Sequence, residues 1–511
     1  MRGGVENRSP LYSEAEDPES PTEPEGPEVP EEPEEPEKPT GPEIIFPETM
    51  RSGTLPTIFI NTEGYAPIID KETKIPATLY IDCSMSDEFE DLGSPEKPLE
   101  LTIKGRGNVS WTNDKKPYKI KFEKKQAPLG LTKSKHFALL AETNRLYLTS
   151  FWGFELGRAV EMAWTPAFQP VELVLNGNYE GLYLLIESVK IQEGRVDIFE
   201  QPEENTDPET IPYGWLVEVD NYLDEFQITV PETADKNVLI THKSPEVLSE
   251  DQRQWLSDEF TDICRRLDTD DILDPTWTEK MDIHSLAQYF IVSELLGNKD
   301  AYTGSFYFHK DSGEGAKWKA GPLWDLSWTV YDDEWMFDSR PDKHVHFIKQ
   351  ALKYPVFVDE VNNIWKTFTP ELMEELYTRL CALSDKVSPV IQNDEARWPQ
   401  YAGHSNIDYL KKYLIPKRYE WVRDNLETLA PDVSGLESPY IQAFDKVFID
   451  GGKLNVVDPG NVVSFGLYDA SGRRLICDAQ SEIDLEGLSK GLYLISVVYD
   501  DGYRANLKFA N

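Results

Sequence analysis

Residues 104–111 have the sequence Lys104-Gly105-Arg106-Gly107-Asn108-Val109-Ser110-Trp111, and residues 115–121 continue as Lys115-Lys116-Pro117-Tyr118-Lys119-Ile120-Lys121. Segments rich in β-formers flank this stretch, so the glycines and asparagine between them predict a tight loop joining two strands. The backbone N–H groups of such a loop could cradle a phosphate, and Arg106 and the lysines would add positive charge. A basic hairpin with a solvated face explains the same residues. Both interpretations remain open at this point.

The surrounding pattern predicts an α+β fold. Short strands are expected at residues 56–61, 77–81, 99–103, 118–122 and 213–219, and residues 171–186 predict a hairpin that turns at Asn176-Gly177. Helical periodicity occupies residues 144–162, 247–297 and 356–430. We therefore expect one unit over residues 51–432, with a strand-rich half followed by a helical half. Residues 439–511 contain short strands with regular turn signals, which predict a small antiparallel β-sandwich.

The first fifty residues differ from the rest in composition. Proline recurs at every third position from Pro18 to Pro42, with glutamate in most of the gaps. Residues 1–50 hold fifteen acidic and three basic residues. We therefore expect residues 1–50 to be a disordered stalk. Because proline fixes φ and like charges repel, the stalk should be extended in the polyproline-II conformation.

The net charge of −41 over 511 residues restricts the class of partner. So acidic a surface repels phosphate backbones, so nucleic-acid binding is not expected, and it would also be repelled by anionic lipid. The four cysteines are scattered without metal-ligand spacing, and no apolar run is long enough to be a transmembrane segment. No signal peptide is visible. Either the protein is cytosolic or its export signal precedes this chain.

Two further stretches place a carboxylate next to a turn. Asp300 follows the predicted helix end at Glu294–Gly297, which is a suitable position for a general base. Asp325 lies between tryptophans in Gly321-Pro322-Leu323-Trp324-Asp325-Leu326-Ser327-Trp328. Each aspartate taken singly is as well explained as a cap or turn residue. Together with a basic loop, they supply the groups that phosphoryl transfer requires.

With these motifs in this order, the chain resembles the CotH kinase family, the spore-coat-protein-H-like secreted kinases with a divergent (atypical) protein-kinase-like fold. The resemblance covers roughly residues 55–430. It rests on residues 106–111, 116–120, 175–187, 214–220, 298–300 and 321–325. It implies ATP-dependent phosphorylation of serine, and of threonine as a second acceptor, on secreted or surface proteins. The acidic surface suggests a basic, serine-rich protein substrate.

The resemblance also implies roles for individual residues. Asp300 would be catalytic, and Asp325 would bind Mg²⁺ or Mn²⁺. The nucleotide would be bound by the loop and its lysine, with an acidic partner for that lysine at Glu187. The complete set of expected nucleotide-binding residues is Arg106, Asn108, Ser110, Lys116 and Glu187.

Two departures from the family pattern keep a second reading open. Family members commonly carry asparagine four or five residues after the catalytic aspartate, where this chain has Gly304 and Ser305. The family's second carboxylate after Trp-Asp is replaced by Ser327. Ser305 or water would have to supply the missing Mg²⁺ ligands. The alternative is a catalytically inactive surface module whose aromatic residues bind a glycan or protein; a hydrolase is weaker, since no GxSxG or HExxH motif occurs.

The C-terminal residues resemble the sorting domain of the type IX secretion system, on the strand and turn pattern of residues 454–457, 463–473, 485–491 and 493–498. This resemblance implies contact with secretion machinery and a secreted or outer-membrane surface-exposed protein. A lipoprotein anchor upstream of residue 1 would be compatible with it. An ordinary accessory β-sandwich is the alternative.

Overall fold

The structure is a computed structural model. It describes residues 52–144, 146–220, 227–231, 237–272, 275–298, 300–327, 346–403, 408 and 415–426, and C-terminal residues 447–450, 453–469, 473–476, 480, 482–485, 487–489, 492–500 and 504–510. The predicted stalk at residues 1–50, together with Trp328, lies outside the described residues. No described helix combines the length and the apolar character needed to cross a lipid bilayer.

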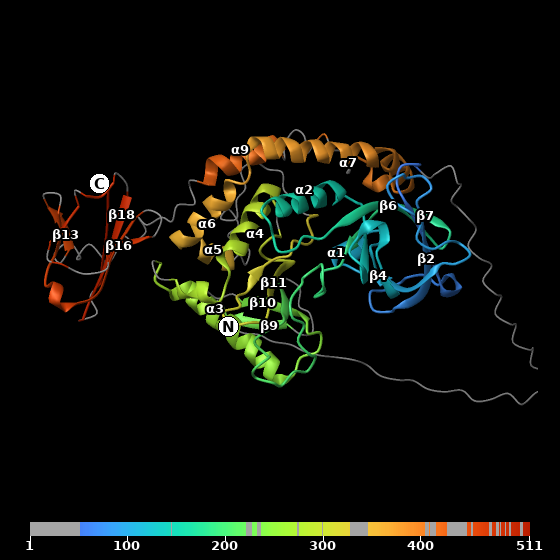
Figure 1. Ribbon diagram of the computed structural model, residues 1–511. Helices are drawn as coiled ribbons and strands as arrows, with labels where there is room; N and C mark the ends of the chain where they lie inside the picture. The colour runs from blue at the N-terminus through green and yellow to red at the C-terminus, as the bar shows by residue number, and fades with distance from the viewer. Residues whose placement is uncertain are drawn as a thin grey trace, which may run out of the picture. The chain divides into compact units, whose positions relative to one another are not determined.

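A closed barrel forms the first part of the fold (Figure 1). Its strands follow the order β1, β2, β3, β4, β5, β7, β6; β1 and β6 pair in parallel and the other neighbours are antiparallel. The strand bounds are Thr57–Thr62 (β1), Ile75–Asp82 (β2), Leu99–Gly105 (β3), Tyr118–Gln126 (β4), Ser134–Ala141 (β5), Phe168–Leu175 (β6) and Asn178–Glu187 (β7). The barrel encloses its own apolar core, to which Ile103, Ile120 and Leu185 belong.

The hairpin between β6 and β7 turns where the sequence predicts it. Leu175 pairs with Asn178, and the two residues between them, Asn176 and Gly177, have φ of 51° and 78°. Positive φ at both central positions matches the right-handed twist of the strands. The hairpin prediction is therefore confirmed.

A second, five-stranded antiparallel sheet has the order β12, β11, β8, β10, β9. Its strands are Trp215–Val219 (β8), Gln227–Pro231 (β9), Asn237–Ser244 (β10), Phe306–Lys310 (β11) and Lys319–Ala320 (β12). The helices are Val109–Thr112 (α1), Leu146–Ala159 (α2), Glu250–Thr269 (α3), Ile283–Leu296 (α4), His346–Ala351 (α5), Pro355–Trp365 (α6), Pro370–Arg397 (α7) and Ile415–Leu426 (α9). The structure thus combines mainly antiparallel sheets with helices, which is compatible with the α+β prediction.

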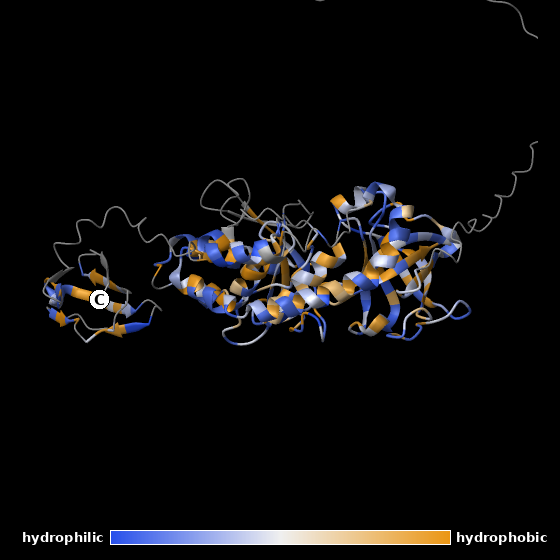
Figure 2. Ribbon diagram, turned by 90° about the horizontal axis from the view of Figure 1, so that it is seen from above, coloured by the Kyte–Doolittle hydropathy of each residue, from blue (hydrophilic) through white to orange (hydrophobic). Residues whose placement is uncertain are grey.

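Helices α2 to α7 and α9 share one apolar core with the second sheet. Helix α3 shows why: Leu256, Phe260, Ile263 and Leu267 recur at helical spacing and are all buried. Figure 2 shows hydrophobic and hydrophilic residues alternating along the helices, as expected for helices that bury one side. Helix α7 extends from α6 and α9 to the barrel strands β6 and β7 (Figure 1).

The C-terminal residues form two antiparallel sheets, β13-β14-β17 and β16-β15-β18-β19. The strands are Val447–Asp450 (β13), Lys453–Val456 (β14), Val462–Asp469 (β15), Arg474–Ile476 (β16), Glu482–Asp484 (β17), Leu492–Tyr499 (β18) and Arg504–Ala510 (β19). Leu454 and Ile483 of one sheet and Phe465 and Ile495 of the other belong to a single core. The two sheets thus face each other across an apolar layer.

Candidate active site

The loop between β3 and β4 is held by its glycines. Gly107 has φ of 85°, and a Cβ there would lie 2.1 Å from the Ser110 hydroxyl oxygen. The Gly105 N–H donates to Asp70 O at 3.0 Å, and the Arg106 N–H donates to Pro117 O at 3.2 Å. The loop is not continuous irregular backbone, because Val109–Thr112 form the single helical turn α1. Both ends of the loop are therefore fixed.

Asn108 and Ser110, both expected to bind the nucleotide, lie on the exposed part of this loop. Asn108 Oδ1 accepts a hydrogen bond from Lys71 Nζ at 3.2 Å. Gly105 lies directly beneath the Trp111 ring, since a Cβ on it would come within 2.5 Å of that ring. The loop is thus stabilised from below while its polar side chains face solvent.

Arg106 extends from this loop toward the second sheet. Its guanidinium carbon lies 5.6 Å from the centre of the Trp324 ring, within range of a cation–π interaction. Burial lowers the pKa of Arg106, and the opposing influence of Asp325, Tyr307 and Glu218 limits that shift. The structure therefore brings Arg106 and Asp325, two of the predicted site residues, into one electrostatic environment.

Glu218 occupies the middle of β8, next to that pair. Its neighbour in β11 is Tyr307, whose hydroxyl hydrogen bonds to Glu218, and Lys243 of β10 forms an ion pair with the Glu218 carboxylate at 2.6 Å. Burial, followed by the Glu218 charge, raises the pKa of Tyr307, so the phenol remains a neutral hydrogen-bond donor. Sequence patterns alone assign no role to Glu218 or Tyr307. Their positions on paired strands became visible only with the register.

Asp325 lies in the loop after β12, between the buried residues Leu323 and Leu326. The residue is exposed and has φ of 53°. Its Oδ1 accepts a hydrogen bond from the Ser327 hydroxyl at 2.8 Å. Buried leucines on both sides thus present a carboxylate to solvent, and the residue that replaces the expected second carboxylate is hydrogen bonded to it.

Asp300 lies in the loop after α4. Gly297, with φ of 63°, ends the helix, and the Asp300 N–H donates to Asn298 Oδ1 at 3.2 Å. The Asp300 carbonyl accepts from the N–H groups of Thr303 and Gly304, each at 2.9 Å. These bonds define the backbone on both sides of the carboxylate.

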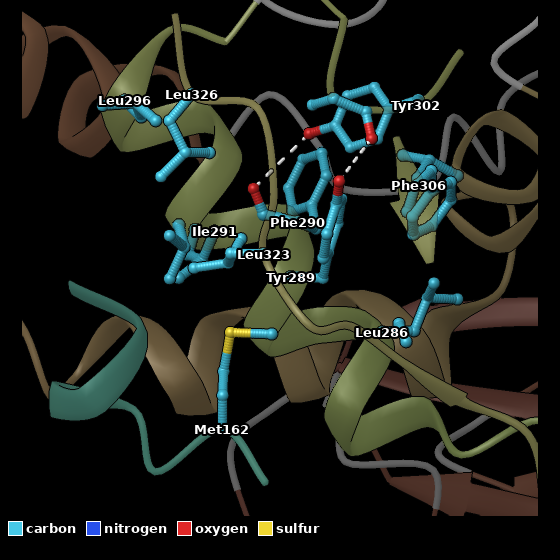
Figure 3. Close-up of a cluster of buried hydrophobic side chains, with 14 of the residues drawn as sticks. Met162, Leu286, Tyr289, Phe290, Ile291, Leu296, Tyr302, Phe306, Leu323 and Leu326 are labelled. Atoms are coloured by element: carbon cyan, nitrogen blue, oxygen red, sulfur yellow. Dashed lines mark hydrogen bonds between the residues drawn. The ribbon is translucent and has the colours of Figure 1, made fainter. Parts of the chain in front are cut away.

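The loops of Asp300 and Asp325 are anchored on the same helix. Figure 3 shows Leu326 beside Leu296 and Leu323 beside Ile291, both on α4. In the same view, hydrogen bonds join the Tyr302 hydroxyl to Phe290 O at 3.4 Å and the Tyr289 hydroxyl to Ala301 O at 2.7 Å. Burial, then the Glu218 charge, raises the pKa of Tyr289, and Asp300 contributes in the same direction. Glu218 and Asp300 therefore both act on Tyr289.

Ser305, the other expected metal ligand, has φ of 51°, so both expected metal ligands are non-glycine residues in the left-handed region. Such backbone strain clusters at functional sites. Among the described residues, however, no three His, Cys, Asp or Glu side chains come together as a metal site. A site that holds Mg²⁺ through one carboxylate, substrate phosphates and water is compatible with a single exposed Asp325.

The side chains of Lys116 and Glu187 form hydrogen bonds with other groups and not with each other. Lys116 Nζ donates to Trp111 O at 2.8 Å and lies 5.2 Å from the Trp111 ring centre. The Glu187 carboxylate accepts from the N–H groups of Thr132 at 2.7 Å and Ala167 at 3.1 Å. Both side chains thus stabilise local backbone.

Lys119 is the lysine of the motif that shares the environment of Arg106. Tyr118 and Ile120 point into the barrel core, so Lys119 lies on the outer face of β4. Burial lowers the pKa of Lys119, with Lys104, Arg106 and Lys190 acting in the same direction and Glu246 opposing them. The alternation of apolar and charged residues along this strand distinguishes Lys119 from its buried neighbours in the sequence alone. This alternation could have identified Lys119 as a candidate.

We name Lys104, Lys119, Lys121 and Lys190 the basic face. Lys104 is the direct partner of Lys119 in the β3–β4 register, and Lys121 is the partner of His136 in β5. The pKa of His136 is lowered to about 4 by burial, then by Lys190, Lys119, Lys121 and Arg195. Within the described residues, none of the four lysines forms an ion pair or hydrogen bond. Cations thus gather without a direct ion pair to a carboxylate, although Glu246 and Asp70 interact with Lys119 and Lys104 at longer range, in a chain where acids far outnumber bases.

Of two cavities in the described part of the chain, the first borders the basic face at Lys121. This cavity, of 850 Å³, is bounded by the outer sides of β1 to β5 and includes Tyr65, Lys74 and Lys121. The other, of 500 Å³, lies beside the Gly321-Pro322 turn and is lined by Trp164, Arg195 and His309, among others. Neither contains a predicted site residue. The residues that line the second cavity include Pro322, which precedes Trp324 by two positions in the chain.

Comparison with known proteins agrees with these motifs. No curated protein matches the chain. The family profile described as "CotH kinase protein" matches residues 103–422, more than half of the 511 residues. The matched range includes the β3–β4 loop, the second sheet, both aspartate loops and helix α7. The chain therefore belongs to the CotH kinase family.

Proposed function

We propose that this protein transfers the γ-phosphoryl group of ATP to serine, and to threonine as a second acceptor, on secreted or surface proteins. Family membership indicates a kinase-like function. The proposed site lies between the barrel and the second sheet, and we infer that these two parts correspond to those of a divergent protein-kinase-like fold. Because the chain carries a net charge of −41, the proposed acceptor is a basic, serine-rich protein, for which KM should rise with salt concentration.

One observation carries the proposal: the Arg106 guanidinium lies over the ring of Trp324, the residue before Asp325, and it acts electrostatically on a lysine of the barrel. Arg106 and Lys104 act electrostatically on Lys119, whereas Asp325 and Glu218 act on Arg106. A triphosphate needs cations for its oxygens, and its metal needs a carboxylate close by. The two kinds of charge occur side by side here.

In the proposed mechanism, Arg106 and Lys119 bind the phosphate oxygens and fix the nucleotide. Asp300 orients the acceptor hydroxyl and accepts its proton on a carboxylate oxygen as the acceptor oxygen bonds to the γ-phosphorus. The bond from the γ-phosphorus to the bridging oxygen breaks, and ADP leaves. Catalysis then consists of positioning and charge neutralisation.

A divalent ion, Mg²⁺ or Mn²⁺, would neutralise phosphate charge and would be held by Asp325, with Ser305 as an additional ligand. The exposed Asp325 carboxylate, whose neighbour Ser327 donates to it, fits such an ion. Asn108 and Ser110, which are exposed on the loop, would contact the phosphates.

The test is transfer of labelled phosphate from ATP to a basic, serine-rich acceptor by the full chain. Wild type should transfer label only with Mg²⁺ or Mn²⁺, and Asp300→Asn should lower kcat by roughly 10²- to 10⁴-fold, the range of general-base catalysis. Lys119→Met and Asp325→Asn should weaken ATP binding, measured by calorimetry. Lys125→Met and Asp385→Asn, at exposed positions of β4 and α7, serve as matched controls.

Metal-dependent ATP binding that Asp325→Asn does not change would contradict the assigned metal ligand. Absence of ATP binding with either metal would contradict the proposed function. It would favour the alternative, a catalytically inactive CotH-like module that binds a glycan or protein at the surface. The observation that favours this inactive module is Ser327, which carries a hydroxyl where the family has a second carboxylate.

We further propose that residues 439–511 act as a sorting domain for the type IX secretion system. The two antiparallel sheets around one apolar core are compatible with that role. The protein would then be secreted or displayed on the outer membrane. Deleting residues 439–511 should retain the protein inside the cell, as followed by fractionation; unchanged export would contradict this proposal.

A further inference from the structure

Lys115, next to the expected nucleotide lysine, is fully buried with 0% of its surface exposed. Its ammonium group lies 2.5 Å from Asp394 Oδ1 of α7. The same group donates to Glu142 O at 2.9 Å and to Leu182 O at 2.8 Å. Three acceptors match the three protons of an ammonium group, so this side chain has a single satisfied orientation.

The acceptors come from separate parts of the fold. Glu142 follows β5, and its carboxylate accepts from the N–H groups of Leu146 and Tyr147 at the start of α2, at 3.0 and 2.8 Å. Leu182 lies in β7, and its N–H donates to the same Asp394 oxygen at 2.6 Å. One lysine therefore joins the barrel, the start of α2 and the end of α7.

The end of α7 is fitted to the barrel around this pair. A Cβ on Gly181 would lie 2.0 Å from Asp394 Oδ1, so only glycine permits the approach. Arg397 Nε donates to Tyr179 O at 2.9 Å, and Trp398 Nε1 donates to Glu180 O at 2.9 Å. The contact is specific, because Tyr179 O, Glu180 O and the Leu182 N–H of β7 are each bound by a side chain from the end of α7 or from Trp398 directly after it.

The pair also lies on the segment that carries the candidate phosphate-binding groups. Two residues after Lys115, Pro117 O accepts the Arg106 N–H, and the Tyr183 hydroxyl donates to Lys116 O at 3.0 Å. Lys119 follows in β4, opposite Lys104. A shift of Lys115 would therefore move the backbone on which Arg106 and Lys119 depend.

We propose that Lys115 and Asp394 form a positioning pair that holds residues 105–119 in place for nucleotide binding. The pair touches neither the proposed nucleotide nor the metal, and acts through Arg106 and Lys119. The effect on nucleotide binding rests on the proposed function. The restraint that the pair places on residues 105–119 does not depend on that function.

The test compares two doubly neutralised variants of the full chain. Lys115→Met/Asp394→Asn removes both charges together, which avoids leaving one buried charge without its counterion. Lys310→Met/Glu259→Gln neutralises a buried pair at 3.1 Å between β11 and α3, both outside residues 105–119; Lys280, which also pairs with Glu259, keeps Asp262 at 3.2 Å. Single Lys115→Met serves as a second variant where folding permits.

Two readouts are taken well below the Tm of each variant. Hydrogen exchange of residues 104–122 should quicken at least tenfold in the Lys115/Asp394 variant, since the Arg106 N–H loses its fixed partner, and should stay near wild type in the control. The Kd for ATP with Mg²⁺ should rise at least tenfold in the first variant and less than twofold in the control. A loss of Tm alone, equal in both variants, would show a merely structural role and overturn the inference.

The outcomes separate this inference from the proposed function. If wild type binds no ATP but exchange in residues 104–122 quickens only in the Lys115/Asp394 variant, the proposed function fails and the positioning pair stands. If wild type binds ATP and neither exchange nor Kd differs between the two variants, the proposed function stands and the positioning pair is wrong.

Discussion

The Arg106 guanidinium lies over the Trp324 ring, with 5.6 Å between the guanidinium carbon and the ring centre, although the two residues come from different parts of the fold. Trp324 is also part of the small apolar cluster of Ile191, Val196, Leu216 and Tyr307. The ring thus rests on β8 and β11 while its other contact is with the loop of the barrel. The relation links the basic loop to the Asp325 carboxylate, one residue after Trp324.

Replacing Arg106 with lysine should weaken ATP binding about tenfold, equivalent to about 1.4 kcal/mol, because lysine loses the planar fork and the stacking on Trp324. Calorimetric titration with ATP and Mg²⁺ measures the change. Arg423→Lys, in which a side chain 51% exposed on α9 is altered, is the control. Equal affinities for Arg106→Lys and wild type would show that Arg106 binds no phosphate.

Restoring a carboxylate beside Asp325 should strengthen metal binding. Ser327→Asp places a second anionic oxygen donor where the hydroxyl now bonds to Asp325 Oδ1. We expect the Kd for Mn²⁺ to fall about tenfold, since affinity rises with the charge of the ligand set. Titration of the full chain with Mn²⁺ measures it. Ser327→Asn, neutral and of the same size, should not share the gain; if it does, charge is not the cause.

Gly181→Ala should destabilise the protein strongly. A Cβ there would meet Asp394 Oδ1 at 2.0 Å, and φ is 86°. We expect the free energy of unfolding to fall by about 3 kcal/mol, which combines backbone strain with displacement of a buried carboxylate. Gly64→Ala is the control, because φ is 59° but nothing lies within 4 Å, so only about 1 kcal/mol of strain is expected. Denaturant unfolding that gave equal losses would contradict the close approach.

His136 should make stability depend on pH. Its pKa is lowered to about 4 in the folded protein, against 6.5 in the unfolded chain. Between these values the unfolded chain binds the proton more tightly, so stability is lost as pH falls from about 6.5 to 4. The loss amounts to at most about 3 kcal/mol, and His136→Asn should remove it from the unfolding profile.

The same histidine reports on the nucleotide. Phosphate bound on the basic face would offset the charges of Lys190, Lys119 and Lys121, raise the pKa of His136 and cause proton uptake on ATP binding at pH 5. Calorimetry in two buffers of different ionisation enthalpy detects that proton. No uptake in wild type, or the same uptake in His136→Asn, would place the phosphates elsewhere.

Arg418→Met should destabilise the protein by about 3–5 kcal/mol, because it leaves the buried Glu294 carboxylate without its cation. Arg418 Nη2 lies 3.1 Å from Glu294 Oε2, and the Tyr302 hydroxyl donates to Glu294 Oε1 at 2.7 Å. Adding Glu294→Gln should restore most of the loss. Urea unfolding of the single and double variants measures the recovery, and a double variant as unstable as the single one would refute the pairing.

Sequence periodicity predicted the local elements well. The Asn176-Gly177 turn, helix α2 and the strands that flank the basic loop lie where the pattern placed them, since each depends on residues close together in the chain. Closure of the barrel was not predictable in this way. It needs the parallel pairing of β1 with β6, in which Ile58 meets Leu173, and no local signal encodes such a partner.

The candidate site shows the same limit. Asp300, Asp325 and Arg106 could be proposed because each stands beside a turn or glycine motif. Glu218 and Tyr307 could not, since they become neighbours only through the β8–β11 register. The choice of Lys116 rested on position within a motif, whereas its hydrogen bond to Trp111 O depends on the helical turn α1. Lys119 was within reach of sequence reasoning through strand alternation alone.

The bond between Lys115 and Asp394 spans 279 residues of the chain. At about 5–20 residues per second, the ribosome needs roughly 15–55 s to make that length after Lys115. During this interval Lys115 beside β4 lacks its counterion, and the start of β7 lacks the helix that contacts it. All seven barrel strands are therefore synthesised well before the helix that pairs with this buried lysine.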